Sequence, residues 1–246
     1  MKENEMIFGI RAVTEAVQSG KEIDKLLVKK DLKGDLVKEL YALLKERNIR
    51  VQLVPAERLN RITRKNHQGV IALVSAVTYH RLEDIIPNVF EQGKYPFIVL
   101  LDGITDVRNF GAIARTCECA GVDAIVIPSK ESVTVNADAM KTSAGALNVL
   151  PVCKEKSVNQ AVRFLKDSGV TIVAANERAS KNYTEISYAG PVAIVMGAED
   201  KGVSAENLRI CDEIVKIPQF GTIGSLNVSV AASILVYEGV RQRMKE

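Results

Sequence analysis

Three polar segments of the sequence carry side chains that could bind a ligand or take part in a reaction. Each comes directly after a short apolar run: "ITDVRNFGAIARTCECAG" follows "FIVLLDG", "AEDKGVS" follows "VAIVMG", and "FGTIGSLNVS" follows "EIVKIPQ". In open parallel sheets, ligands bind beyond the carboxyl ends of the strands. The three segments are therefore where the sequence predicts a ligand site.

The first segment holds an amide and a long cation close together. Asn109 or Asp106 could cap a helix that begins near Gly111 and ends at Gly121. Because helical side chains lean back toward the N-terminus, Arg115 should point toward the loop and Asn109. Its neighbours at helical spacing are small, so it has room to reach a ligand. The alternative is an ordinary surface arginine.

The second and third segments supply a carboxylate and a glycine-rich loop. Glu199 comes just past a buried run, although an Asp/Glu/Lys/Gly sequence is also a common turn. Gly221 and Gly224 let main-chain N–H and C=O groups approach a ligand closely. Ser225 or Asn227 could cap the following helix, whose N-terminus would favour an anion. A glycine turn before a core helix is the structural alternative.

Composition and charge indicate a globular protein with one basic part. The chain has 246 residues, of which 47% are hydrophobic and 26% charged, enough for one large domain or two of moderate size. Residues 1–80 hold 15 Lys and Arg against 10 Asp and Glu, whereas the remainder holds 18 against 20. A basic front and a nearly neutral rear suggest that the front part contacts a polyanion.

The sequence argues against several kinds of site. Its four cysteines form no C-x-x-C pair and it has two histidines, so no zinc site is indicated. There is no G-x-x-x-x-G-K-[ST], and no G-x-G-x-x-G after the first strand of either half. A Ser/His/Asp set is implausible, because neither His67 nor His80 lies in the loop-rich half. We expect no metal.

No targeting or membrane segment is expected. "MKENEMIFGIRAV" lacks the apolar region of a secretion signal. Residues 217–237 are uncharged and long enough to span a bilayer, but glycines, serines and an asparagine gather at their start. Unpaired, mostly buried cysteines are typical of a cytoplasmic protein.

Two α/β domains are predicted, at 1–77 and 94–246, joined by a linker at 78–93. In the front, helical patterns in "GIRAVTEAVQSG" and "GDLVKELYALLKERN" alternate with the strand-like "IDKLLVKK", "IRVQLV" and "GVIALVSAV". From Phe97 onward, dense Val- and Ile-rich runs alternate with helical stretches. Such near-continuous apolar strands predict a parallel sheet covered on both faces.

The three polar segments, in this order, resemble the three motifs of the SpoU class of knotted 2′-O-ribose RNA methyltransferases. The front half resembles the L30e-like substrate domain of that family, ending in "HQGVIALVSA", so the resemblance spans nearly the whole chain. It is nearest to the branch that methylates a guanosine in 23S rRNA. Arg11 stands where the family often has His, and Gly224 replaces a common hydroxyl residue. The matching residues are Asn109, Gly111, Arg115, Gly197, Glu199, Gly202, Ile217, Pro218, Ser225, Leu226 and Asn227.

The resemblance implies a C-terminal trefoil-knot methyltransferase domain, S-adenosylmethionine as cofactor, and a homodimer formed through the C-terminal domain. It implies that the backbone around Gly197, Ile217 and Leu226 holds the adenosine of the cofactor. The family proposal makes Arg115 a general base; because arginine stays protonated in proteins, we expect it to stabilise alkoxide charge. The implied residues around the ribose and its phosphate are Asn109, Arg115, Glu199, Ser225 and Asn227.

The front domain is expected to bind the RNA through Arg58, Arg61, Arg64 and Lys65. If "PAERLNRITRKN" is helical, Arg58, Arg61 and Lys65 fall at i, i+3 and i+7 on one face. Like charges on one face suit a polyanion, although a basic solvated surface is the simple alternative.

Three other functions stay open. One is a tRNA ribose 2′-O-methyltransferase, and another is a non-catalytic rRNA-binding protein that assists ribosome assembly on the same scaffold. The third, a Rossmann-type small-molecule methyltransferase, lacks its glycine-rich first loop and would not need a basic front domain.

Overall fold

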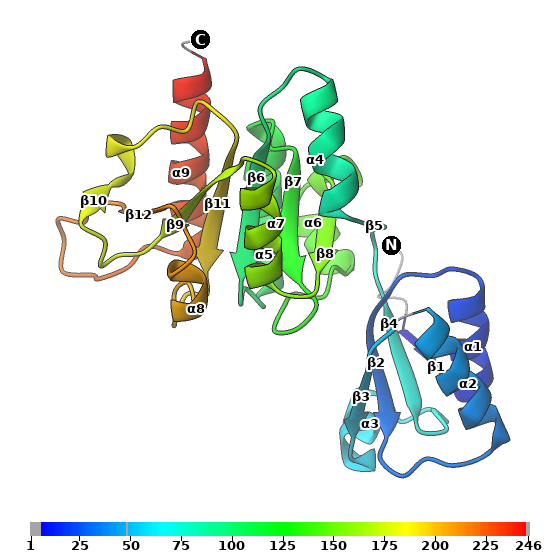
Figure 1. The fold of residues 1–246 in the computed structure, drawn as a ribbon. Coiled ribbons are helices and arrows are strands. Elements are labelled where there is room, and N and C mark those ends of the chain that lie inside the picture. Colours follow the sequence, from blue (N-terminus) through cyan, green and yellow to red (C-terminus); the bar gives the residue numbers. More distant parts are fainter. Residues whose placement is uncertain (1–5, 48, 245–246) are drawn as a thin grey trace. The chain divides into compact units, whose positions relative to one another are not determined.

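The computed structural model describes residues 6–47 and 49–244, which fold into two compact units (Figure 1). The first unit contains the chain up to Thr78 together with Thr134–Ala137; the second contains Tyr79–Val133 and the chain from Asp138 onward. Within the described residues, the strands form a four-stranded and an eight-stranded sheet. Helices pack on both sheets, which confirms the predicted α/β class. The outer ends of the two expected domains, at 1–5 and 245–246, lie outside the described residues.

The first unit is a mixed sheet with the strand order β1-β4-β2-β3. Strands β2 and β3 are parallel, whereas β4 is antiparallel to β1 and to β2. Both helices and all three strands that the sequence pattern indicated are present. β1 was not predicted, because three residues are too few to show a period. The elements are β1 (Met6–Phe8), α1 (Ile10–Gln18), β2 (Ile23–Lys29), α2 (Asp35–Glu46), β3 (Val51–Val54), α3 (Ala56–Ile62) and β4 (Val70–Val74).

Helices cover both faces of this small sheet. Successive side chains of a strand point to opposite faces, so Leu26 and Val28 of β2 lie on one face and Leu27 on the other. The first face is covered by the apolar stripes of α1 and α2, and the second by Leu59 of α3. This double cover explains why the apolar run in β2 is nearly continuous.

A short segment of the later chain completes the first unit. Val135 is fully buried, and its N–H donates to Oδ2 of Asp24 in β2 at 3.0 Å. Its carbonyl oxygen accepts a hydrogen bond from the main-chain N–H of Ala76 at 2.8 Å. The first unit is thus assembled from two separate stretches of sequence.

The second unit is built on the eight-stranded sheet, with the order β10-β12-β9-β11-β6-β7-β8-β5. Among the described residues, the neighbouring strands of this sheet all pair in parallel, as the dense apolar runs predicted. The three strands that the sequence did not indicate are short and partly polar. The strands are β5 (Tyr79–His80), β6 (Phe97–Asp102), β7 (Ala124–Pro128), β8 (Val152–Glu155), β9 (Thr171–Ala175), β10 (Lys181–Asn182), β11 (Val192–Gly197) and β12 (Glu213–Lys216).

Both faces of the large sheet are covered. Ile98 and Leu100 of β6 share a core with α4 and α7, whereas Phe97 points the other way and packs on Gly239 of α9. Helix α9 lies beside β11 and α5. No helix within the described residues combines the length and the apolar character of a membrane span. The helices are α4 (Leu82–Glu91), α5 (Val107–Cys119), α6 (Ala137–Thr142), α7 (Val158–Asp167), α8 (Ala205–Leu208) and α9 (Val228–Arg243).

The segment expected as a linker, 78–93, holds β5 and α4, and from Tyr79 onward it belongs to the second unit. Leu82 and Ile86 of α4 are buried in the core of the large sheet, and Val89 is buried as well. These residues are spaced as i, i+4 and i+7, which forms an apolar stripe on a helix. The segment was expected as a linker because its polar residues and proline dominate its composition, whereas the apolar stripe appears only when the residues are placed at helical spacing.

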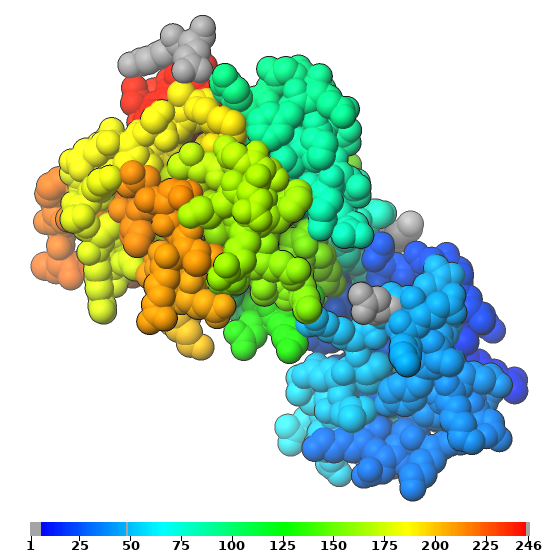
Figure 2. Space-filling model, in the orientation of Figure 1, coloured from blue at the N-terminus to red at the C-terminus, as the bar shows by residue number. Residues whose placement is uncertain are grey.

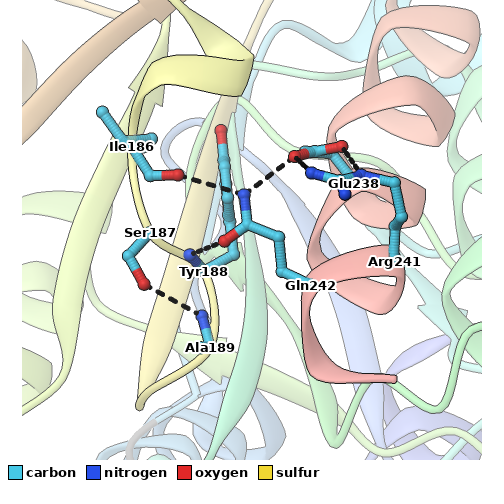
Figure 3. A network of polar contacts seen from close by, with 7 residues as sticks. All are labelled: Ile186, Ser187, Tyr188, Ala189, Glu238, Arg241 and Gln242. Carbon is cyan, nitrogen blue, oxygen red and sulfur yellow. Dashed lines mark hydrogen bonds and ion pairs between the residues drawn. The ribbon is translucent and has the colours of Figure 1, made fainter. Parts of the chain in front are cut away.

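Polar contacts fix the C-terminal end of α9 (Figure 3). The Gln242 side-chain oxygen accepts from the N–H of Tyr188 at 2.9 Å, and its nitrogen donates to the carbonyl of Ile186 at 3.1 Å. The same nitrogen donates to Glu238 at 2.8 Å. Glu238 also accepts two hydrogen bonds from Arg241, at 2.6 and 2.7 Å. The helix end is thereby tied to the segment that leads into β11.

Arg243 extends this attachment to the other neighbouring strand. Its guanidinium lies 4.5 Å from the centre of the Phe97 ring and donates to four main-chain carbonyls. Since these carbonyls precede β6 and β11, α9 is held at one end by the start of the two strands beside it. The carbonyls belong to Tyr95, Pro96, Tyr188 and Gly190.

Candidate functional site

A cavity of about 630 Å³ lies at the carboxyl ends of β6, β9, β11 and β12. This volume is within the range of small-molecule sites, roughly 300–1,000 Å³. It is where the sequence pattern predicted a ligand site. The lining includes Gly197, Glu199, Ile217, Ser225 and Leu226 from the predicted set.

The wall of the cavity beyond β11 is formed by main chain. Gly202 has a φ of +66°, and its N–H donates to the carbonyl of Ala198 at 2.7 Å, which closes a tight turn. A Cβ on Gly197 would overlap main-chain atoms of Gly202 and Val203. Only glycine therefore allows the strand end and the returning turn to lie against each other.

A carboxylate that the sequence analysis missed holds this turn in place. Oδ2 of Asp102, at the end of β6, accepts from the N–H of Ser204 at 2.8 Å. It also accepts from the side-chain nitrogen of Asn207 at 2.8 Å. Asp102 also lines the cavity. The sequence does contain a signal for Asp102, because an acidic residue followed by glycine ends the apolar run "FIVLLDG". In the structure Gly103 has a φ of +76°, which turns the chain at this point.

Side chains from the three polar segments meet in one hydrogen-bonded cluster, which we call the Asn–Glu–Asn cluster: Asn109, Glu199 and Asn227. The Asn227 side-chain nitrogen donates to Oδ1 of Asn109 at 3.0 Å and to Oε1 of Glu199 at 3.1 Å. The Asn109 nitrogen donates to Oε2 of Glu199 at 3.5 Å. These residues come from the start of α5, the turn after β11 and the start of α9.

Two helix caps orient the cluster. Asp106 caps α5, because its Oδ1 accepts from the N–H of Asn109 at 2.8 Å; the Asn109 side chain therefore remains available to the cluster. Asn227 caps α9, because its Oδ1 accepts from the N–H and the hydroxyl of Ser229 at 2.9 and 2.6 Å. The oxygen of Asn227 thus serves the helix and its nitrogen serves the cluster.

Helix α5 begins earlier than the sequence analysis expected. It starts at Val107 rather than near Gly111, since the cap is Asp106. Gly111 lies inside the helix, where an added Cβ would stand 2.6 Å from Cβ of Thr142. This glycine serves close packing of the helix, not its start.

The remaining predicted residues are placed differently with respect to the cavity. Ser225 and Leu226 line it, as do Gly197 and Ile217. Arg115 is exposed on α5, and no residue in the described part of the chain gives it a hydrogen bond or an ion pair. Its guanidinium is therefore unpaired within the described residues.

None of the four cysteines lines the cavity, and three of them have a raised thiol pKa. Burial raises the pKa of Cys117 and of Cys153 to about 12, so both stay protonated. Burial, together with Asp212, raises the pKa of Cys211 to about 11. Across residues 6–47 and 49–244, no group of His, Cys, Asp and Glu could hold a metal ion.

The four basic residues predicted to bind RNA are exposed in the first unit, but they do not share one helix face. Helix α3 ends at Ile62, because Thr63 has an extended backbone and its hydroxyl oxygen accepts from the N–H of Lys65 at 3.2 Å. The i+7 position expected for Lys65 is therefore wrong. Arg58 and Arg61 remain neighbours on α3, and the residues beyond its end are Arg64 and Lys65.

Two protein families match the sequence of the chain. The SpoU rRNA Methylase family matches residues 96–237, which hold all three polar segments. The family described as RNA 2'-O ribose methyltransferase substrate binding matches residues 6–80. A relative from Staphylococcus saprophyticus, described as a TrmH family tRNA/rRNA methyltransferase, is 34% identical over 241 residues, 98% of this chain and 97% of the relative.

Solved structures show the same fold. An AdoMet-bound rRNA methyltransferase from Sinorhizobium meliloti is 27% identical with a TM-score of 0.61, covering 96% of this chain and 86% of that one. A TrmH/SpoU tRNA modifying enzyme from A. aeolicus is 32% identical with a TM-score of 0.57, covering 67% of this chain and 85% of that one.

Proposed function

The chain belongs to the SpoU rRNA methylase family, and on that basis we propose that it methylates the ribose 2′-hydroxyl of a guanosine in 23S rRNA, with S-adenosylmethionine as methyl donor. The observation that carries the proposal is the Asn–Glu–Asn cluster beside a cavity at the carboxyl ends of the parallel strands.

The volume of the cavity and the residues that line it both suit S-adenosylmethionine. The proposed contacts are the main chain around Gly197, Ile217 and Leu226, all of which line the cavity. The turn that follows Gly197 lines the cavity, and main-chain N–H and C=O groups can hydrogen-bond a purine without a dedicated side chain. When bound, S-adenosylmethionine supplies an activated methyl group, so no metal is required.

The proposed catalytic groups are Asn109, Arg115, Glu199, Ser225 and Asn227. Fixed polar groups that face a reacting ribose can position its hydroxyl for an in-line approach without reorganising. The mutual hydrogen bonds of the cluster, and the two caps beneath it, support this positioning role. Arg115 has no competing partner among the described residues, so its charge is available to stabilise the developing alkoxide while the 2′-hydroxyl proton passes to water and the oxygen takes the methyl group from the sulfonium.

The choice of 23S rRNA rests on the resemblance of the motifs to the branch that methylates guanosine there. Descriptions of the relatives include both rRNA and tRNA, so a tRNA ribose is the second candidate substrate. A non-catalytic role in ribosome assembly is the third. The four cysteines form no disulfide among the described residues, and a cytoplasmic location is proposed on the general distribution of disulfides between compartments.

The test is a map of ribose methylation in rRNA and tRNA from cells with and without this protein. We expect one 2′-O-methylguanosine of 23S rRNA to disappear in cells that lack it. Loss of a tRNA methyl group instead would assign the second substrate. Unchanged maps, together with no S-adenosylmethionine binding at millimolar concentration in calorimetric titration, would favour the assembly role.

The first unit is proposed to supply the sequence-independent contacts to RNA through Arg58, Arg61, Arg64 and Lys65. For the Arg58→Ala/Arg61→Ala variant we expect the magnitude of the salt slope of RNA affinity to fall by about 0.7 to 0.9 per lost phosphate contact. Lys38→Ala is the control, because Lys38 also carries one positive charge in the first unit but pairs with Asp35 at 3.0 Å. Filter binding over a range of salt concentrations measures both, and equal slopes for variant and control would remove α3 from the RNA surface.

A homodimer through the C-terminal domain completes the proposal. Val230 and Tyr237 of α9 are seven residues apart, share a helix face and are 48% and 49% exposed. A two-fold related copy is the commonest cover for such a face. The trefoil knot of the family stays a prediction from the resemblance.

A further inference from the structure

The loop between β12 and α9 carries an aromatic side chain that lies almost wholly in water. Phe220 is 97% exposed and Ile223 is 78% exposed. Every residue from Gln219 to Asn227 is exposed. In Figures 1 and 2 this orange loop projects from the left side of the second unit. A phenyl ring held in solvent gains nothing within the described chain, which is typical of a side chain that contacts a partner.

The position of the loop connects this ring to the candidate site. Gln219 at the beginning of the loop lines the cavity, and so do Ser225 and Leu226 at its end. Phe220 is thus one residue removed from the cavity wall. The loop ends at Asn227, which belongs to the Asn–Glu–Asn cluster, so a substrate bound at the cluster would lie beside the end of this loop.

Two glycines keep the main chain around the ring uncovered. Neither Gly221 nor Gly224 has a positive φ, and a Cβ on either would meet nothing within 4 Å. Glycine is therefore required here neither by backbone conformation nor by crowding from the described residues. What the two glycines provide is bare main chain beside Phe220, which leaves space for a flat group to approach.

We propose that the ring of Phe220 stacks on a base of the RNA next to the ribose that is methylated, an inference that rests on the proposed function. A nucleotide that has left the helical stack presents its ribose to a recessed site most fully, and its base then needs a new partner. Unstacked bases are commonly received by aromatic side chains, and such stacking tolerates any base. The polar residues Gln219 and Thr222 interrupt the exposed apolar side chains of Phe220 and Ile223 along the loop, which suits a flat ligand with polar edges, such as a base.

The first experiment uses the absence of tryptophan from the chain. Phe220→Trp introduces a single fluorescent reporter at the proposed stacking position, and Ile223→Trp places one on the same exposed loop as a matched control. Both are titrated with a single-stranded RNA 12-mer of mixed sequence. We expect saturable quenching by more than half for Phe220→Trp and a small change for the control. Equal quenching of the two variants, or none for Phe220→Trp, overturns the proposal.

The second experiment separates a stacked ring from mere apolar area. Phe220→Ala and Phe220→Leu should each weaken binding of the same RNA by roughly 5- to 150-fold, the range measured for loss of one stacked base. Phe220→Tyr should retain most of the affinity, because its ring keeps a π-face. Wild-type affinity of Phe220→Leu would overturn the proposal.

Two further measurements show whether the Phe220 ring contacts the cofactor or a second copy of the chain instead of RNA. The affinity for S-adenosylmethionine and the particle mass by light scattering should be the same for Phe220→Ala and wild type. A loss of cofactor affinity would mean that the ring covers the cofactor, and a lower mass would mean that it contacts a second copy. Either result overturns stacking on RNA.

Failure of the stacking proposal and failure of the proposed function give different results in these experiments. Quenching of Phe220→Trp in a protein whose wild type methylates neither rRNA nor tRNA would refute the proposed function and leave stacking intact. Methylation by the wild type without quenching would refute stacking alone.

Discussion

Gly197→Ala is expected to abolish binding of S-adenosylmethionine and to destabilise the second unit. The added Cβ would overlap the main chain of Gly202 and Val203, so the turn after β11 must move as a whole. Main chain cannot rotate away as the tip of a side chain can. Overpacking of this kind costs about 1–3 kcal/mol of folding free energy, or more where the backbone resists. The displaced turn also carries Glu199.

Calorimetric titration with the donor and a thermal melt measure the two effects. The matched control is Gly190→Ala, because Gly190 has no positive φ and a Cβ there meets nothing within 4 Å. The control should bind and melt like wild type. Unimpaired donor binding by Gly197→Ala would show that the main-chain wall of the cavity does not hold the cofactor.

Arg115→Ala is expected to lower the single-turnover rate of methyl transfer by about 10²- to 10³-fold, the usual cost of removing one group that stabilises developing charge. Stability should change by no more than about 0.5 kcal/mol, since the side chain is exposed and has no partner among the described residues. Arg163→Ala is the control: Arg163 is also an exposed helical arginine, but it lies on α7, outside the three polar segments, and donates to Asn159 at 2.9 Å.

The Arg115→Lys variant distinguishes charge stabilisation by Arg115 from proton removal by Arg115. If its charge acts on the alkoxide, Arg115→Lys should recover part of the rate and leave the shape of the pH–rate profile unchanged. A profile that shifts with the lysine would support proton removal by this residue. Collapse of Arg115→Ala in a thermal melt would instead give the side chain a structural role.

Much of the second unit could be predicted, because buried parallel strands leave a strong local signal. The runs of Val and Ile at 97–102 and 192–197 need cover on both faces, so they had to alternate with helices. The meeting of Asn109, Glu199 and Asn227 then follows, since the carboxyl ends of parallel strands share one edge.

What could not be predicted depends on contacts between distant residues or on very short elements. The need for glycine at 197 arises from the returning turn at 202–203, whose position no local pattern encodes. β5 and β10 have two residues each and owe their extended form to a neighbouring strand. The early end of α3 follows from one hydroxyl of Thr63, which competes with continuation of the helix.

The burial of Val135 in the first unit has a consequence for how this protein can be taken apart. Because the chain leaves the first unit after Thr78 and supplies Thr134–Ala137 to it later, that unit is not a cassette that ends at one point of the sequence. A fragment cut after Thr78 would leave the N–H of Ala76 without the carbonyl of Val135, and would uncover the apolar surface on which Val135 lies. Exchange of this unit between relatives would therefore require grafting two stretches of sequence, and natural recombination at a single junction would leave it incomplete.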